Sequence, residues 1–103
     1  MIPAYVLTAT AETELQDIIA YTYDRWGEDQ ARAYANTLLG SMTALAAGHE
    51  RYRDLADLHP GLRTAKSGRH HIFCLVRVDA PALVIAILHE RMDLMMRLNE
   101  RLT

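Results

Sequence analysis

The sequence has almost no cysteine and no long apolar run, and each absence excludes a class of protein. Cys74 is the only cysteine, so this chain alone can form neither an intramolecular disulfide nor a thiolate metal cage. The longest apolar run, Ala80–Leu88, is far shorter than the ~20 residues that a membrane-spanning helix needs. The N-terminal Met1-Ile2-Pro3 carries no basic segment or cleavage site, so we expect a cytoplasmic protein.

An overall excess of positive charge is also missing. The net charge of -2 argues against a general nucleic-acid binder, because affinity for a phosphate backbone comes from accumulated Lys and Arg. The charge is nevertheless unevenly distributed, with a net charge of -5 for residues 1–59 and +3 for residues 60–103. The second half therefore carries the cationic surface.

The chain contains enough hydrophobic residues to form one core. Hydrophobic residues make up 50% of the 103 positions and charged residues 23%, which is typical of a folded protein. No internal repeat and no Gly/Ser linker divides the chain. We therefore expect a single domain over residues 1–103.

The first quarter of the chain predicts a short strand followed by a helix. Residues 5–7 are suited to the strand, and Thr8 or Thr10 to the helix N-cap. Apolar residues then recur at steps of three and four until Gly27, as expected for an amphipathic helix. Trp26, near its end, is expected to pack in the core or in the turn.

A second helix is predicted to begin at Glu28 or Asp29 and to end at Gly48. The connection at Gly27 is short, so the two helices should form an antiparallel hairpin. Four aromatic residues cluster on this hairpin, where they could anchor a partner: Tyr21, Tyr23, Trp26 and Tyr34.

After a loop at residues 48–61, the pattern changes to an antiparallel meander of three strands. Its predicted strands are Leu62–Lys66, His71–Val78 and Leu83–His89, joined by turns at Ser67-Gly68 and Asp79-Ala80-Pro81. The middle strand, which includes Cys74 as a buried residue, is apolar on both faces and should be covered on both sides.

The tail at Leu94–Leu102 has helical spacing and is expected to cover part of the second face. The predicted class is α+β: an N-terminal strand, a helical hairpin packed on a small antiparallel sheet, and a short C-terminal helix.

Five strings of residues carry a family resemblance over nearly the whole chain. The most specific is Leu88-His89-Glu90-Arg91-Met92-Asp93, which runs from a strand end into an unusual His-x-Arg-x-Asp spacing. The others are Ala11–Leu15, Tyr21–Gly27, Pro60-Gly61-Leu62-Arg63 and Gly68-Arg69-His70-His71-Ile72-Phe73. On these strings the chain resembles the ParE branch of the RelE/ParE toxins.

The resemblance implies a RelE/ParE-like fold and the toxin of a type II toxin–antitoxin system. Such a toxin is held inactive by a ParD-like antitoxin in a higher-order hetero-oligomer. When released, it inhibits DNA gyrase by protein binding and causes growth arrest, which underlies plasmid stabilisation. It implies no cofactor, no enzymatic reaction and no sequence-specific DNA binding.

The expected partners are therefore two proteins, the ParD-like antitoxin and DNA gyrase, and neither a membrane nor a specific DNA site. The antitoxin is expected to contribute an acidic, amphipathic C-terminal segment that lies over the sheet and the helical hairpin.

A basic set without any acid between its members lies on the meander. Arg63, Lys66, Arg69 and Arg77 form it, and His70 and His71 add latent charge. Such a set can hold an acidic partner segment or a phosphate. Charged side chains also discourage unwanted pairing at the edge of a sheet, so a solvated strand edge is the alternative.

The closing motif predicts a corner rather than a catalytic group. His89, Arg91 and Asp93 alternate along one face if the last strand continues through them, so that His89 can pair with Asp93 or with another acid. The candidate residues for binding antitoxin or target are Arg63, Lys66, Arg69, His70, Arg77, His89, Arg91, Met92 and Asp93.

Two other functions remain open. A RelE-like ribosome-dependent mRNA endoribonuclease would hold phosphate with Arg63 and Arg69 and use His89 as a general acid. However, all five tyrosines precede the meander, so His89 is expected to act alone, and the chain is acidic overall. The third hypothesis is a module that binds antitoxin without toxicity.

The five histidines do not indicate a metal site. None of them lies in an H-x-x-x-H or a Cys/His ligand spacing, so we expect no bound metal.

Overall fold

The chain folds in the expected order of strand, helical hairpin, sheet and terminal helix. The computed structural model describes residues 3–49 and 51–102. Its elements are β1 (Tyr5–Leu7), α1 (Ala9–Trp26), α2 (Glu28–Ala47), β2 (Arg53–Asp54), β3 (Leu62–Ser67), β4 (His70–Leu75), β5 (Ala82–His89) and α3 (Leu94–Leu102). The predicted α+β class is confirmed.

The strands form one sheet in the order β1-β5-β4-β3-β2. The antiparallel meander of β3, β4 and β5 is confirmed, and β1 adds a parallel pair on β5. Strand β2 lies within the segment predicted as a loop and pairs with the start of β3. It has two exposed residues, so no apolar alternation marked it in the sequence.

An irregularity in β5 places apolar residues on both faces of the sheet. The residue opposite β4 changes from Ala86 to Val84, which leaves Ile85 without a partner in the register. Such a bulge reverses the alternation of the faces. Val84 and Ile87 therefore pack toward the hairpin, whereas Ile85 and Leu88 pack on the opposite face.

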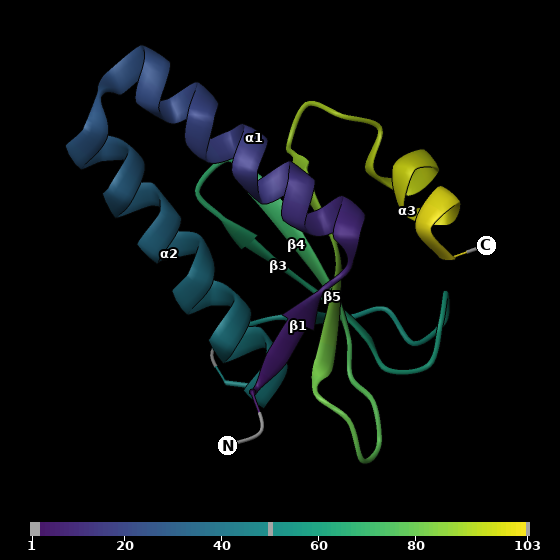
Figure 1. The fold of residues 1–103 in the computed structure, drawn as a ribbon. Coiled ribbons are helices and arrows are strands. Elements are labelled where there is room, and N and C mark those ends of the chain that lie inside the picture. The colour runs from purple at the N-terminus through teal and green to yellow at the C-terminus, as the bar shows by residue number, and fades with distance from the viewer. Residues whose placement is uncertain (1–2, 50, 103) are drawn as a thin grey trace.

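Helices cover both faces, as the apolar middle strand predicted. Figure 1 shows α1 and α2 on one side of the sheet and α3 on the other. The buried core under the hairpin includes Leu38, Met42, Leu45, Ile72, Cys74 and Val84. The second core, under α3, consists of Leu62, Phe73, Ile85, Ala86, Leu88 and Leu98.

The predicted helix ends are confirmed. The Thr8 hydroxyl accepts a hydrogen bond from the Ala11 N–H at 3.1 Å and so caps α1. Gly48 ends α2 in the left-handed conformation, with a φ of 75°, and its N–H bonds to carbonyls of the last turn.

Two expectations about burial are wrong. Val78 is 89% exposed, because β4 ends at Leu75 and Val78 enters a turn in which Asp79 has a φ of 62°. Trp26 is 69% exposed rather than packed in the core or turn. The tip of the hairpin extends beyond the sheet, so the apolar stripe of α1 has nothing to cover at that end (Figure 1).

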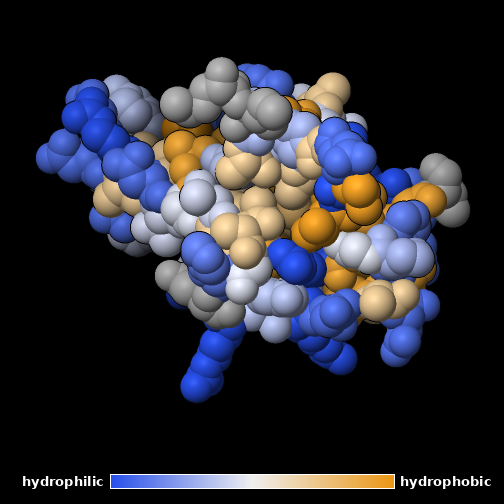
Figure 2. Space-filling view, turned by 90° about the horizontal axis from the view of Figure 1, so that it is seen from below, coloured by the Kyte–Doolittle hydropathy of each residue, from blue (hydrophilic) through white to orange (hydrophobic). Residues whose placement is uncertain are grey.

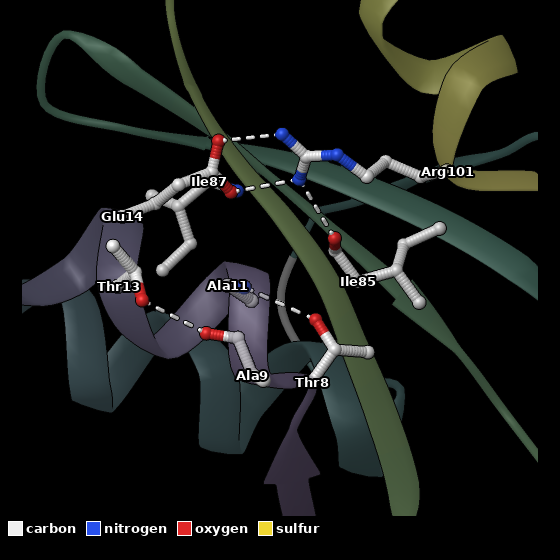
Figure 3. Close-up of polar contacts among 8 residues, drawn as sticks. All are labelled: Thr8, Ala9, Ala11, Thr13, Glu14, Ile85, Ile87 and Arg101. Carbon is white, nitrogen blue, oxygen red and sulfur yellow. Dashed lines mark hydrogen bonds and ion pairs between the residues drawn. The ribbon is translucent and has the colours of Figure 1, made fainter.

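An ion pair between α1 and α3 seals the edge of β5 where β1 ends (Figure 3). The register of β1 reaches only Val84. Beyond it, a Glu14 carboxylate oxygen accepts from the Ile87 N–H at 3.2 Å, and Arg101 donates to the Ile85 carbonyl at 3.1 Å. The two side chains bond each other twice at 2.9 Å. Side chains thus replace a strand at this edge.

The surface is mixed in character. Seen from below relative to Figure 1, hydrophobic patches are interrupted by hydrophilic residues (Figure 2). Within residues 3–49 and 51–102, no helix has the length and apolarity required to cross a membrane.

Candidate functional site: an aromatic and histidine cleft

A cleft of about 980 Å³ lies between the helical hairpin and the ends of β4 and β5. Helix α1 and the start of α2 form one wall, and the β3–β4 turn and the end of β5 form the other. Its lining consists of Asp17, Ile18, Tyr21, Thr22, Trp26, Gln30, Tyr34, Gly68, Arg69, His70, His89 and Arg91.

Tyr34 connects α2 to the β3–β4 turn through three contacts. Its hydroxyl oxygen lies 2.6 Å from Nδ1 of His70, 3.1 Å from the Arg69 N–H and 3.3 Å from the Ser67 carbonyl. All three are satisfied when the hydroxyl donates to Ser67 and accepts from Arg69 and from a protonated Nδ1. In this arrangement, Nε2 of His70 is left as a hydrogen-bond acceptor.

The corner after β5 fixes the second histidine. Nδ1 of His89 accepts from the Arg91 N–H at 3.1 Å, so in neutral His89 the proton is on Nε2. The rings of His70 and His89 meet edge to face, with centroids 5.2 Å apart. The two histidines therefore form a pair at the floor of the cleft.

The hydrogen-bonded corner has a different partner from the one predicted. Strand β5 ends at His89 instead of continuing, so His89 and Asp93 do not share a strand face. The Asp93 carboxylate accepts from the Met96 N–H at 3.1 Å and caps α3, while the Arg91 backbone bonds His89. The expected pairing of His89 with Asp93 is wrong.

The basic set is divided among three places. Lys66 and Arg69 lie 2.9 Å and 3.7 Å from the Glu90 carboxylate beside the cleft. Arg63 stacks on the Tyr52 ring and donates to the last turn of α2. Arg77 donates to the Pro81 carbonyl at the β4–β5 connection. Only part of the set borders the cleft, and the binding roles of all its members remain predictions.

The expectation that His89 acts without a nearby tyrosine is wrong. Tyr34 precedes the meander by many residues, yet its hydroxyl contacts His70, which in turn packs against His89. The sequence feature that could have indicated this contact is the position of Tyr34 on the apolar stripe of α2, which faces the sheet. The register of α2 on the sheet, which sequence periodicity does not specify, decides this contact.

Burial lowers the pKa of His70 below its usual value, and neighbouring His89 lowers it further. Glu90 acts in the opposite direction. The hydrogen bond from Lys66 holds the pKa of the Glu90 carboxyl below its usual value. Near neutral pH, His70 is therefore uncharged, and the charged side chains of Lys66, Arg69 and Glu90 lie beside the cleft.

Acidification is expected to destabilise the fold through His70. The unfolded chain binds a proton at its ordinary pKa of 6.5, whereas the folded chain binds it only at lower pH. The contribution of neutral His70 to the free energy of unfolding is complete above pH 6.5 and is lost as the pH falls through the pKa of the folded state. Urea unfolding at a series of pH values should show it, with a shallower decline for His70→Gln than for His49→Gln. Equal declines would contradict the assignment.

Gly68 allows Tyr34 to approach the turn. Its φ is 60°, and a Cβ at this position would lie 2.5 Å from Cε1 of the Tyr34 ring. We expect Gly68→Ala to cost about 2 kcal/mol in stability, from the left-handed backbone and from displacement of the ring. The Nδ1 signal of His70 in ¹⁵N spectra should shift as well. Gly40→Ala, at an open helical position, is the control and should cost nothing.

The remaining candidate chemistry is limited. Cys74 is fully buried, as expected, and burial raises the pKa of its thiol to about 11, so it is not a reactive nucleophile. No group of three or more potential metal ligands occurs in the part of the chain that the structure describes.

Comparison with known proteins gives a consistent result. A family model described as the ParE toxin of the type II toxin–antitoxin system parDE matches residues 5–94. Toxin ParE of Escherichia coli is 52% identical over 99 residues, covering 96% of both chains. Toxin ParE1 of Mycobacterium tuberculosis is 36% identical over 89 residues, covering 86% of this chain and 91% of its own.

A solved structure shares the fold. It is described as the chromosomal ParDE TA system from P. aeruginosa and superposes with a TM-score of 0.62, over 85% of this chain and 96% of that one. At 14% identity, this likeness concerns the fold alone.

Proposed function

The chain belongs to the ParE toxin family of type II toxin–antitoxin systems, and we propose that it inhibits DNA gyrase by binding the enzyme. We further propose that a cognate ParD-like antitoxin neutralises it in a hetero-oligomeric complex in the bacterial cytoplasm. The observation that carries the proposal is the family match over residues 5–94, which includes all of the sheet and both helices of the hairpin.

Family membership supports a toxin that binds its target rather than an enzyme. The cleft agrees with binding, because its exposed aromatic side chains and arginines are the residue types that dominate protein interfaces. The single-domain organisation and the binding roles of Arg63, Lys66, Arg69, His70, Arg77, His89, Arg91, Met92 and Asp93 are part of the same proposal.

A supercoiling assay tests the gyrase target. Purified chain added to gyrase and relaxed plasmid should reduce supercoiling, and prior mixing with the antitoxin encoded beside it should restore the reaction. A Leu38→Asp variant, which places a charge in the core, is the inactive control. Full supercoiling at excess toxin would reject the gyrase target and leave the family assignment intact.

The ribonuclease alternative has one observation in its favour. Tyr34, His70 and His89 lie together at the floor of a cleft with arginines at its rim, which is a possible acid–base group. This alternative predicts cleavage of ribosome-bound messenger that His89→Ala abolishes. Intact transcripts during toxin-induced growth arrest would exclude it. Antitoxin binding without growth arrest would instead support a non-toxic module.

A further inference from the structure

The hairpin wall of the cleft exposes aromatic surface that the fold does not use. Tyr21 is 60% and Trp26 is 69% exposed, and both line the cleft together with Ile18. Large aromatic side chains contribute most of their free energy when a partner removes them from water. This wall is therefore suited to an apolar side chain of a partner.

The opposite wall presents hydrogen-bond donors and positive charge. Among the described residues, the Arg91 guanidinium has no hydrogen bond and no ion pair. The Arg69 guanidinium has only a 3.7 Å contact with the Glu90 carboxylate. Because Nδ1 of His89 accepts from the Arg91 N–H, the Nε2–H of this ring is available as a further donor. Two guanidinium groups and an imidazole N–H at one wall form a site for carboxylate.

From this juxtaposition we propose that the cleft anchors an acidic segment of the antitoxin, with an apolar side chain against Trp26 and a carboxylate on Arg91 and Arg69. The inference rests on the antitoxin half of the proposed function and not on gyrase. It names the part of the toxin surface that the antitoxin occupies and the chemistry of the segment that fits there.

The distribution of charge favours a peptide over a nucleic-acid strand. Asp17 lines the hairpin wall, and residues 1–59 carry a balance of -5. A continuous phosphate backbone would pass this acidic surface, whereas a peptide can place its carboxylates at the strand wall and an apolar residue at the hairpin wall.

Protonation should accompany binding. His70 faces Tyr34 from α2 and His89 from β5, with Arg69, His71 and Glu90 from the strand ends and Asp17 from α1 nearby. A carboxylate beside the His70 ring favours the charged form of that ring. Affinity for an acidic peptide should therefore rise as the pH is lowered from about 8 to about 6.

Trp26 is the only tryptophan and reports directly on the cleft. The probe is the blocked peptide acetyl-Leu-Glu-Asp-Leu-amide, titrated into the full chain while Trp26 fluorescence is recorded. The amide counterpart acetyl-Leu-Gln-Asn-Leu-amide separates the carboxylate contribution from the apolar one. Arg91→Ala should weaken the acidic peptide about tenfold, as expected for one charge-assisted contact. The matched variant Arg97→Ala, on the exposed side of α3, should not change the affinity.

Three outcomes would overturn the proposal. They are no fluorescence change at millimolar peptide, equal affinity for the acidic and amide peptides, and tighter binding of a thymidine octamer than of the acidic peptide. The last would identify a nucleic-acid site instead. Rising affinity toward about pH 6 that His70→Gln reduces would support the carboxylate placement beside the histidines.

A second experiment uses the toxin–antitoxin complex itself. Toxin labelled with 5-fluorotryptophan gives one ¹⁹F signal, from position 26, that unlabelled antitoxin cannot obscure. The signal should shift and lose its solvent isotope effect when the complex forms, with co-elution as independent proof of assembly. An unchanged signal in an assembled complex would reject the antitoxin as occupant, whereas a negative gyrase assay would affect only the proposed target.

Discussion

Replacing Arg101 by alanine should lower the free energy of unfolding by about 3 kcal/mol, the loss typical of breaking a largely buried ion pair. Both side chains of the Arg101–Glu14 pair are 19% exposed, so solvent screens them little. Removal of the guanidinium leaves the Glu14 carboxylate without its partner and the Ile85 carbonyl without its donor. Urea unfolding of wild type and variant measures the difference.

Two further variants identify the cause. Arg97→Ala removes an exposed arginine from the same helix and should change stability by less than about 0.5 kcal/mol. Glu14→Met combined with Arg101→Met removes both charges and should recover part of the loss, because no unpaired charge remains. Recovery should be incomplete, since the Ile85 carbonyl and the Ile87 N–H would lose their partners. A wild-type stability for Arg101→Ala would show that the pair is not a structural contact.

Local signals determined how much of the fold could be predicted. Thr8, Gly27 and Gly48 marked the helix ends, and they do so because each supplies a cap or a backbone conformation that its neighbours cannot. Strand β2 and the bulge at Ile85 were missed, because both depend on pairing with a distant strand. The pair of Glu14 and Arg101 was also missed, because the two residues are 87 positions apart in the chain.

The candidate site was predicted in parts and not as an assembly. Arg69, His70, His89 and Arg91 were identified from the meander and closing motif, and they do line one cleft. Trp26 was predicted to pack in the core or in the turn, because it continues the three- and four-residue spacing of the apolar stripe of α1. The hairpin tip, however, extends beyond the sheet that would bury it. Periodicity gives the face of a helix but not how far a neighbouring element extends.

The same geometry separates stability from binding. The cleft lies at the hairpin tip and the turn ends, where few core residues are present, whereas α3 and the Glu14–Arg101 pair close the opposite face and the β5 edge. The family match ends at residue 94, so almost all of α3 lies outside it. Substitutions in α3 should therefore change stability with little direct effect on the cleft.

Leu98→Ala should destabilise the protein by about 3 kcal/mol, through lost burial and the cavity that remains. Leu98 is fully buried in the second core and is the only fully buried residue that α3 contributes among residues 94–102. If α3 detaches, Arg101 leaves Glu14 as well, so Leu98→Ala and Arg101→Ala share one consequence. A double-mutant cycle should give a combined loss about 1–2 kcal/mol smaller than the sum of the single losses.

Hydrogen exchange distinguishes detachment from a local cavity. In Leu98→Ala, the amides of α3 and the Ile87 N–H should lose protection, while Leu38 and Met42 in α2 keep it relative to global stability. Met96→Ala, at a position 54% exposed on the same helix, is the matched control and should leave exchange unchanged. Strict additivity in the cycle, with α3 still protected, would show that Leu98 fills space without holding the helix on the sheet.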